Sequence, residues 1–238
     1  MKLTDEQIKK LIPYIIEATA LKPFQVERTV ELLQEGSTVP FIARYRKEHT
    51  GELDEVQLRN VEEQFSYFCE LEERKIAVLK SIELQGKLTP ELMERITVSR
   101  QKTEVEDLYL PYKPKRRTKA TVARERGLEP LADIIAAQEL TAGTPEDAAY
   151  HFIDPEKEVP DVTTALEGAG HILAERLSDN ADARAMVRRL TKEEGVIISR
   201  VAASYKERVT KYEMYYDYQE PLKAVPSHRM LAMRRAEK

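Results

Sequence analysis

DEVQLRNVEEQFSYFCELEERKIAVLKSIELQG, residues 54–86, is the stretch that decides the fold of this chain. It opens on Asp54, a residue type that caps helix N-termini, and closes on Gly86, which favours the left-handed backbone that stops a helix. Some 30 residues at about 1.5 Å each give a helix of roughly 45 Å, longer than one compact core needs. We therefore expect a long helix that braces several smaller units. Its apolar seam recurs at helical spacing and comprises Leu58, Val61, Phe65, Phe68, Leu71, Leu79 and Ile82.

Two shorter helices are predicted before it. Thr4 and Gln7 form a capping-box pattern, and Pro13 is expected to kink or shorten the helix that follows. Pro23 is placed to start a second helix that ends near Gly36. Together they resemble a helix-turn-helix. Gln25, Arg28 and Thr29 are the only donors suited to reading bases, so a packing hairpin without sequence readout is the favoured interpretation.

Further short helices are predicted along the rest of the chain. They begin at Thr89-Pro90, near Thr103, at Leu128, at Pro145, at Asp161 and near Asp179 or Asn180, and a last basic helix covers residues 227–238. Residues 195–199 (GVIIS) are the only β-like run, and they are too short and isolated to imply a sheet. Because the last helix is not capped, we expect the chain to be a piece of a longer protein.

These signals predict an all-α fold, an irregular multi-helical array with an N-terminal helix-turn-helix-like hairpin and one long bracing helix. Three parts are expected: residues 1–53 with a basic and aromatic loop, residues 54–153 with the long helix and the basic stretch, and residues 154–238 leading to a downstream domain.

The composition agrees with a helical, cytoplasmic protein. Charged residues make up 34% of the chain, above the usual quarter, whereas Gly is sparse and Trp is absent. A single Cys excludes an internal disulfide and fits a reducing compartment. No apolar run is long enough to cross a bilayer, and the N-terminus does not resemble a signal peptide.

The stretch YLPYKPKRRTKATVARER, residues 109–126, concentrates positive charge on a chain whose net charge is −4. From Pro111 to Arg126 three Lys and four Arg face one Glu, a local charge of +6. Nucleic-acid backbone is the commonest reason for such a patch, and a helix start capped by Thr118 or Thr121 could help to hold a phosphate. Alternatively, the cations pair with acidic helices, for example at Glu62-Glu63 or Glu70–Glu73, or lie in a solvated loop. The candidate nucleic-acid-binding residues are Lys113, Lys115, Arg116, Arg117, Lys119 and Arg124.

The segment PFIARYRKE, residues 40–48, interleaves aromatic residues with Arg44, Arg46 and Lys47. Such a mixture can stack bases and hold phosphates. The favoured interpretation is structural: Phe41, Ile42 and Tyr45 anchor a loop to the core, and the three cations extend into solvent.

Residues for catalysis or for metal binding are sparse. The histidines, His49, His151, His171 and His228, are scattered, and none forms a helical zinc pattern with a carboxylate. Cys69 lies in the apolar seam and is interpreted as a small buried hydrophobe. There is no Gly-rich phosphate loop or nucleophile elbow, so we expect neither an enzyme nor a cofactor or metal.

Four long strings resemble the Tex family of bacterial transcription accessory proteins. They are TVPFIARYRKEHTGELDEVQLRNVEEQ (38–64), QGKLTPEL (85–92), TEVEDLYLPYKPKRRTKATVARERGLEPLAD (103–133) and EPLKAVPSHRMLAMRR (220–235). The resemblance implies an N-terminal helix-turn-helix-like unit and a long helical region. An RNase H-like (YqgF-type) domain, helix-hairpin-helix elements and an S1 domain, the main nucleic-acid reader, are implied beyond this chain.

On this basis we expect a non-enzymatic scaffold that binds RNA or DNA backbone without sequence preference. The alternative is a protein-interaction scaffold that docks the downstream RNase H-like and S1 domains or the transcription machinery. No membrane partner is expected. The family position of the last basic cluster suggests an interdomain role for His228, Arg229, Arg234 and Arg235.

Overall fold

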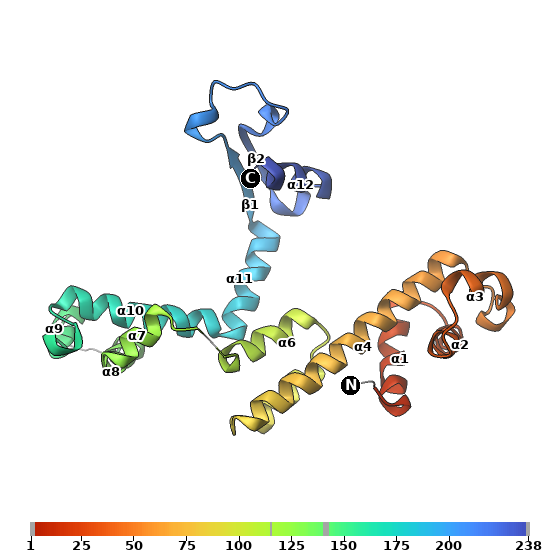
Figure 1. Ribbon diagram of the computed structural model, residues 1–238, viewed down its shortest axis with the longest axis horizontal. Coiled ribbons are helices and arrows are strands. Elements are labelled where there is room, and N and C mark those ends of the chain that lie inside the picture. Colours follow the sequence, from red (N-terminus) through yellow and green to blue (C-terminus); the bar gives the residue numbers. More distant parts are fainter. Residues whose placement is uncertain (1–2, 115, 140–142, 237–238) are drawn as a thin grey trace. The chain divides into compact units, whose positions relative to one another are not determined.

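The structure is a computed structural model that describes residues 3–114, 116–139 and 143–236 (Figure 1). Its contacts divide the chain into two compact units, Met1–Lys113 and Pro114–Lys238. Both are mainly helical, so the predicted all-α class is confirmed, with one small strand pair added. The three-part division drawn from the sequence stays a prediction.

Helix α4 (Glu55–Leu84) organises the first unit and confirms the predicted long helix. The Asp54 side chain accepts a hydrogen bond from the Gln57 N–H, and Gly86 has a φ of +66° after the helix end. The other helices of this unit, all of which contact α4, are α1 (Asp5–Thr19), α2 (Pro23–Gln34), α3 (Val39–Tyr45), α5 (Pro90–Val98) and α6 (Lys102–Tyr109). Two 3₁₀ turns, η1 (Glu48–Thr50) and η2 (Leu110–Tyr112), complete the unit.

Most of the predicted seam of α4 is buried. Leu58, Val61 and Ile82 have no exposed surface, whereas Phe65 is half-buried. Lys75 is also buried, a position that the apolar pattern did not reveal, and its Nζ donates to Glu72 Oε1 at 2.7 Å and to the Thr97 carbonyl at 2.9 Å. Pro13 does not shorten α1, which continues to Thr19.

The second unit is built around α10 (Val162–Asp179). Three short helices pack on it: α7 (Lys119–Glu125), α8 (Glu129–Ala137) and α9 (Pro145–Tyr150). Small side chains, among them Ala123, Ala165 and Ala169, fill the core together with Leu128 and Ile172. The 3₁₀ turn η3 (Pro155–Lys157) lies before α10.

Beyond α10, the chain forms α11 (Ala181–Glu194) and an antiparallel pair of strands, β1 (Val196–Arg200) and β2 (Asp217–Pro221). The prediction that residues 195–199 do not imply a sheet was therefore wrong. The partner strand lies about 20 residues further along and reads as polar, so local sequence gave no sign of the pairing. Between the strands lie η4 (Ala203–Tyr205) and η5 (Glu213–Tyr215), and η6 (Leu222–Ala224) and α12 (Ser227–Ala236) follow.

Candidate nucleic-acid interface

Helix α3 carries the first candidate surface. Ile42 and Val39 belong to a buried cluster with Leu53 and Leu58. Phe41, in contrast, is 42% exposed and Tyr45 is 67% exposed. The predicted core role is thus confirmed for Ile42 and wrong for Phe41 and Tyr45. The reason is helical periodicity: positions i and i+4 share one face, and Ile42 points its own face at the core.

The exposed rings form a compact group with cations. The ring centroids of Phe41 and Tyr45 are 5.3 Å apart at 46°, and the guanidinium of Arg46 lies 6.0 Å from the Phe41 centroid. Arg44 and Lys47 are also exposed. Lys47 Nζ lies 3.5 Å from Glu52 Oε2, whereas residues 39–47 contain no carboxylate. We call residues 41 and 44–47 the α3 cluster.

The backbone after the α3 cluster is held by α2. Gln25 Nε2 donates to the Gly51 carbonyl at 2.9 Å, and the buried Thr50 hydroxyl donates to the Lys47 carbonyl at 3.0 Å. Gly51 has a φ of +66°, and a Cβ there would lie 2.7 Å from the Phe24 ring. Only glycine allows this ring to lie so close to the turn. The cluster is therefore presented on a fixed backbone.

The same contacts bear on the helix-turn-helix prediction. Gln25 is engaged with Gly51 and with the Lys22 N–H, and the buried Thr29 hydroxyl donates to the Gln25 carbonyl. Arg28 pairs with Glu31 at 2.7 Å. The donors that a base reader would need are thus used within α2 and its neighbours, which supports the packing hairpin.

The basic stretch is divided between paired and unpaired cations. Arg117 pairs with Glu125 at 2.6 Å and Arg126 with Glu158 at 2.5 Å. Within the described residues, the exposed side chains of Arg116 and Lys119 make no ion pair. The pKa of Glu106 is lowered by the hydrogen bond from Arg74 and, to a smaller extent, by the nearby charge of Lys113. Lys115 lies outside the described residues.

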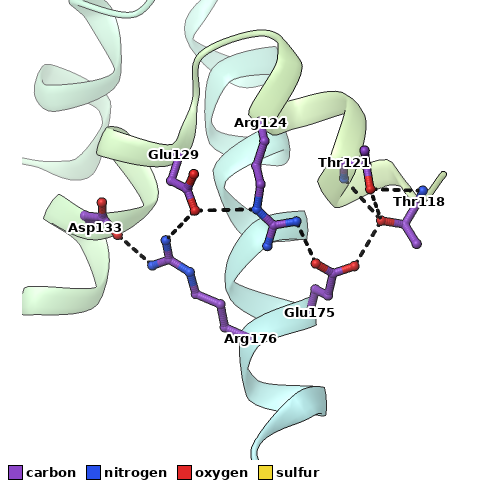
Figure 2. Close-up of polar contacts among 7 residues, drawn as sticks. All are labelled: Thr118, Thr121, Arg124, Glu129, Asp133, Glu175 and Arg176. Carbon is purple, nitrogen blue, oxygen red and sulfur yellow. Dashed lines mark hydrogen bonds and ion pairs between the residues drawn. The ribbon is translucent and has the colours of Figure 1, made fainter. Parts of the chain in front are cut away.

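Arg124 belongs to a polar network that joins α7, α8 and α10 (Figure 2). Its Nη1 donates to Glu175 Oε2 at 2.7 Å, and its Nε lies 3.5 Å from Glu129 Oε1. Arg176 donates to the same Glu129 oxygen at 3.0 Å and to Asp133 Oδ1 at 2.7 Å, and the pKa of Arg176 is raised by these bonds. Arg124 thus holds three helices of the second unit together.

The N-terminus of α7 also faces a carboxylate. Thr118 caps the helix as predicted, and its hydroxyl donates to Glu175 Oε1 at 3.0 Å. A phosphate at this helix start would meet the negative charge of Glu175, so the exposed cations outside the network are the better candidates for a phosphate contact.

In the last basic cluster, Arg229 makes its contacts within the second unit. Its Nη1 donates to Glu220 Oε2 at 2.6 Å and to the Tyr218 hydroxyl at 2.7 Å, which ties α12 to β2. His228, Arg234 and Arg235 are exposed. The interdomain role of these four residues stays a prediction.

The described residues do not show features of two other classes of site. They contain no group of three His, Cys, Asp or Glu side chains that could hold a metal ion, and none of their helices is long and apolar enough to cross a membrane. Cys69 is half-buried, and burial, followed by the charges of Glu73 and Glu70, raises the pKa of its thiol to about 11.

Two groups of residues that shape these surfaces were not predicted from the sequence. The carboxylates Glu129, Asp133 and Glu175 are distant in sequence from the arginines they bind. The exposure of Phe41 and Tyr45, by contrast, had a signal: their i,i+4 spacing on a different face from Ile42. That signal becomes visible only once residues 39–45 are recognised as a helix.

The fold and these surfaces define a class, that of helical proteins with exposed cations and exposed aromatic rings. Comparison with known proteins then defines the family. Residues 9–83 match the Tex-like protein N-terminal domain, and residues 141–238 match the Tex central region-like family. The chain belongs to the Tex family and contains its N-terminal and central regions.

Relatives match nearly the whole chain. It is 51% identical to Protein YhgF of Escherichia coli (strain K12) over 212 residues, 89% of this chain and 27% of that protein. It is 45% identical to the Transcriptional accessory protein Tex of Neisseria gonorrhoeae, over 96% of this chain and 29% of that protein. S1 RNA-binding domain-containing protein 1 of Homo sapiens is 26% identical over 95% of this chain and 23% of that protein. The chain thus spans less than a third of the length of these relatives.

Proposed function

We propose that this chain is a non-enzymatic helical scaffold of a transcription accessory protein and that it binds RNA or DNA backbone without sequence preference. The observation that carries the proposal is the α3 cluster, where Arg44 and Arg46 are exposed and make no ion pair among the described residues, whereas the exposed Lys47 lies 3.5 Å from Glu52. The unpaired Arg116 and Lys119 of the second unit add to it. The name of the N. gonorrhoeae relative supports the transcriptional setting.

The proposed contacts are electrostatic. Each cation that neutralises a phosphate releases counterions, so the affinity falls steeply as salt rises. The flexible, exposed side chains of Arg44 and Arg46 suit the phosphate oxygens of any sequence. An acidic chain with such local positive surfaces would bind nucleic acid at these places only.

The test is the salt dependence of binding to a labelled 20-nucleotide RNA and to a 20-base-pair DNA duplex. R44A/R46A is expected to weaken binding and to reduce the slope of log K against log salt by about 1.4–1.8, the effect of two lost phosphate contacts. The control K9A/K10A removes the same charge from exposed positions of α1 and should leave the slope nearly unchanged. Equal effects of the two variants, or no binding at low salt, would reject the proposal.

A protein-interaction scaffold is the second candidate. It is favoured by α11, of whose residues none is buried and on which Met186 and Val187 are exposed apolar side chains. The greater length of the relatives supports docking against further domains of such a protein. The remaining part of E. coli YhgF, added as a separate protein, should then bind the chain. M186D/V187D should abolish this binding, whereas the control V56D on α4 should leave it unchanged.

A further inference from the structure

The rings of the α3 cluster lie outside the buried cluster that joins α3 to α4. Val39 and Ile42 already fill the contact with α4, whereas Phe41 and Tyr45 leave much of their surface in water. Two aromatic residues exposed together form a larger apolar surface than scattered single ones, and such surfaces mark binding sites. The question is therefore which partner these rings take.

We propose that Phe41 and Tyr45 form a stacking platform for the unpaired bases of single-stranded nucleic acid. Every base has a π-face that can stack on such a ring, and the neighbouring Arg44, Arg46 and Lys47 are placed to bind the phosphates of the same strand. In a duplex the base faces are stacked on one another and are closed to the rings. The platform therefore selects single strands over duplexes, which cations alone do not do.

The positive charge around the rings favours a nucleic-acid strand over an apolar peptide as their partner. An apolar segment gains nothing from three cations around the rings, whereas a polyanion is attracted by them. The guanidinium of Arg46 lies over the Phe41 ring, 6.0 Å from its centroid, so a cation is already within reach of a strand that stacks on these rings.

The platform is also ordered before binding. The turn after α3 is bonded to Gln25, and Phe24 packs on Gly51, so the rings are carried by a short helix fixed at its inner face and at its end. A preformed site loses less conformational entropy when the strand binds.

This inference rests on the proposed function only in that both require the cations of α3; the rings add strand selectivity. The chain contains no Trp, so F41W introduces a single indole fluorophore. We expect saturable quenching of its emission by oligo(dT) and oligo(U) of 15 nucleotides, because a stacked base lies against the indole, and little quenching by a 15-base-pair duplex. A blue shift that grows with protein concentration in the absence of nucleic acid would instead indicate self-docking of the rings and would overturn the proposal.

Binding of the same probes to F41A/Y45A gives the second measurement. Since stacking contributes about 1–3 kcal/mol per base, single-strand affinity should fall at least about fivefold, whereas duplex affinity should hold. Y150A is the matched control, because Tyr150 is 68% exposed, as Tyr45 is, and lies outside the cluster. Circular dichroism checks that all variants fold.

The outcomes separate the two proposals. If F41A/Y45A binds both probes like the parent and F41W is not quenched, the stacking platform is refuted, even where R44A/R46A still lowers the salt slope. If neither probe binds at low salt, both the backbone-binding proposal and the stacking-platform proposal are refuted.

Discussion

Gly168 gives the sharpest test of the packing in the second unit. It is buried in α10, where an added Cβ would lie 2.3 Å from Leu128 Cδ1 and 3.4 Å from Ala123 Cβ. Leu128 is only 1% exposed, so its side chain has little room to move away. We expect G168A to be destabilising, although alanine is the better helix former.

The magnitude follows from a comparison within the same helix. Gly170 is exposed and has no atom within 4 Å of the Cβ position, so G170A should gain about 0.5–1 kcal/mol from helix propensity alone. G168A receives the same gain but suffers overpacking of about 1–3 kcal/mol. The two variants should therefore differ by about 1–3 kcal/mol, with G168A the less stable.

The measurement is urea and thermal unfolding of the whole chain, followed by circular dichroism. Adding L128A to both variants should remove most of the difference, since the clashing methyl group is then gone, and a double-mutant cycle would give this coupling directly. If G168A unfolds at the same midpoint as G170A or above it, the close approach between α10 and Leu128 is not as described.

Three further predictions concern polar groups. R124M removes the cation that pairs with Glu175, whose side chain is only 15% exposed, and should lower the free energy of urea unfolding by about 1–3 kcal/mol. R28M, which breaks an exposed pair, should lower it by about 0.5 kcal/mol or less. Equal losses in the two variants would contradict the network. The hydrogen bond from Arg74 lowers the pKa of Glu106 below 4.5, so its stabilisation is present above that pH and is lost as pH falls through the folded-state value. The destabilisation by E106Q should thus be constant from pH 7 to 5 and should shrink at lower pH, and a constant difference down to pH 2 would be inconsistent with this sign. The Cys69 thiol, with a pKa of about 11, should react with a disulfide reagent at pH 8 about a hundredfold more slowly than an unperturbed thiol. Unfolding in urea should remove this difference in rate. Fast reaction of the folded chain would argue against the burial of this thiol.

Local sequence signals predicted much of the helical framework. Asp54 and Gly86 bracket α4 because capping is decided by a few neighbouring residues, and the same holds for Thr4 and Thr118. The predicted shortening of the helix at Pro13 was wrong, since α1 continues to Thr19, whereas the predicted kink stays a prediction. A proline removes one hydrogen bond, a loss that the buried Leu11 and Ile15 on either side can offset.

The same local sequence signals did not predict contacts between segments that are distant in the sequence. The strand Asp217–Pro221 is polar and contains no strong β-former run, so its pairing with Val196–Arg200 depends on where the intervening segment returns. In the same way, nothing near Arg124 indicates Glu175, which lies 51 residues further along. The direction of a side chain on α3 likewise depends on contacts with Leu53 and Leu58.

The net charge of a segment in the sequence therefore differs from the charge that stays unpaired at the surface of the fold. The basic stretch has the highest local charge of the sequence, yet Arg117, Arg124 and Arg126 each face a carboxylate in the fold, so much of that charge is neutralised at short range. The α3 cluster has fewer cations, but only Lys47 faces a carboxylate, and the rings beside them offer a contact that salt does not screen. At physiological salt, where bare phosphate contacts weaken, a site that adds stacking to charge keeps more of its affinity than one that relies on charge alone. For this reason α3 is a stronger candidate than the basic stretch for the nucleic-acid contact that we propose. The salt slopes of R44A/R46A and R116A/K119A, compared side by side, would decide between them.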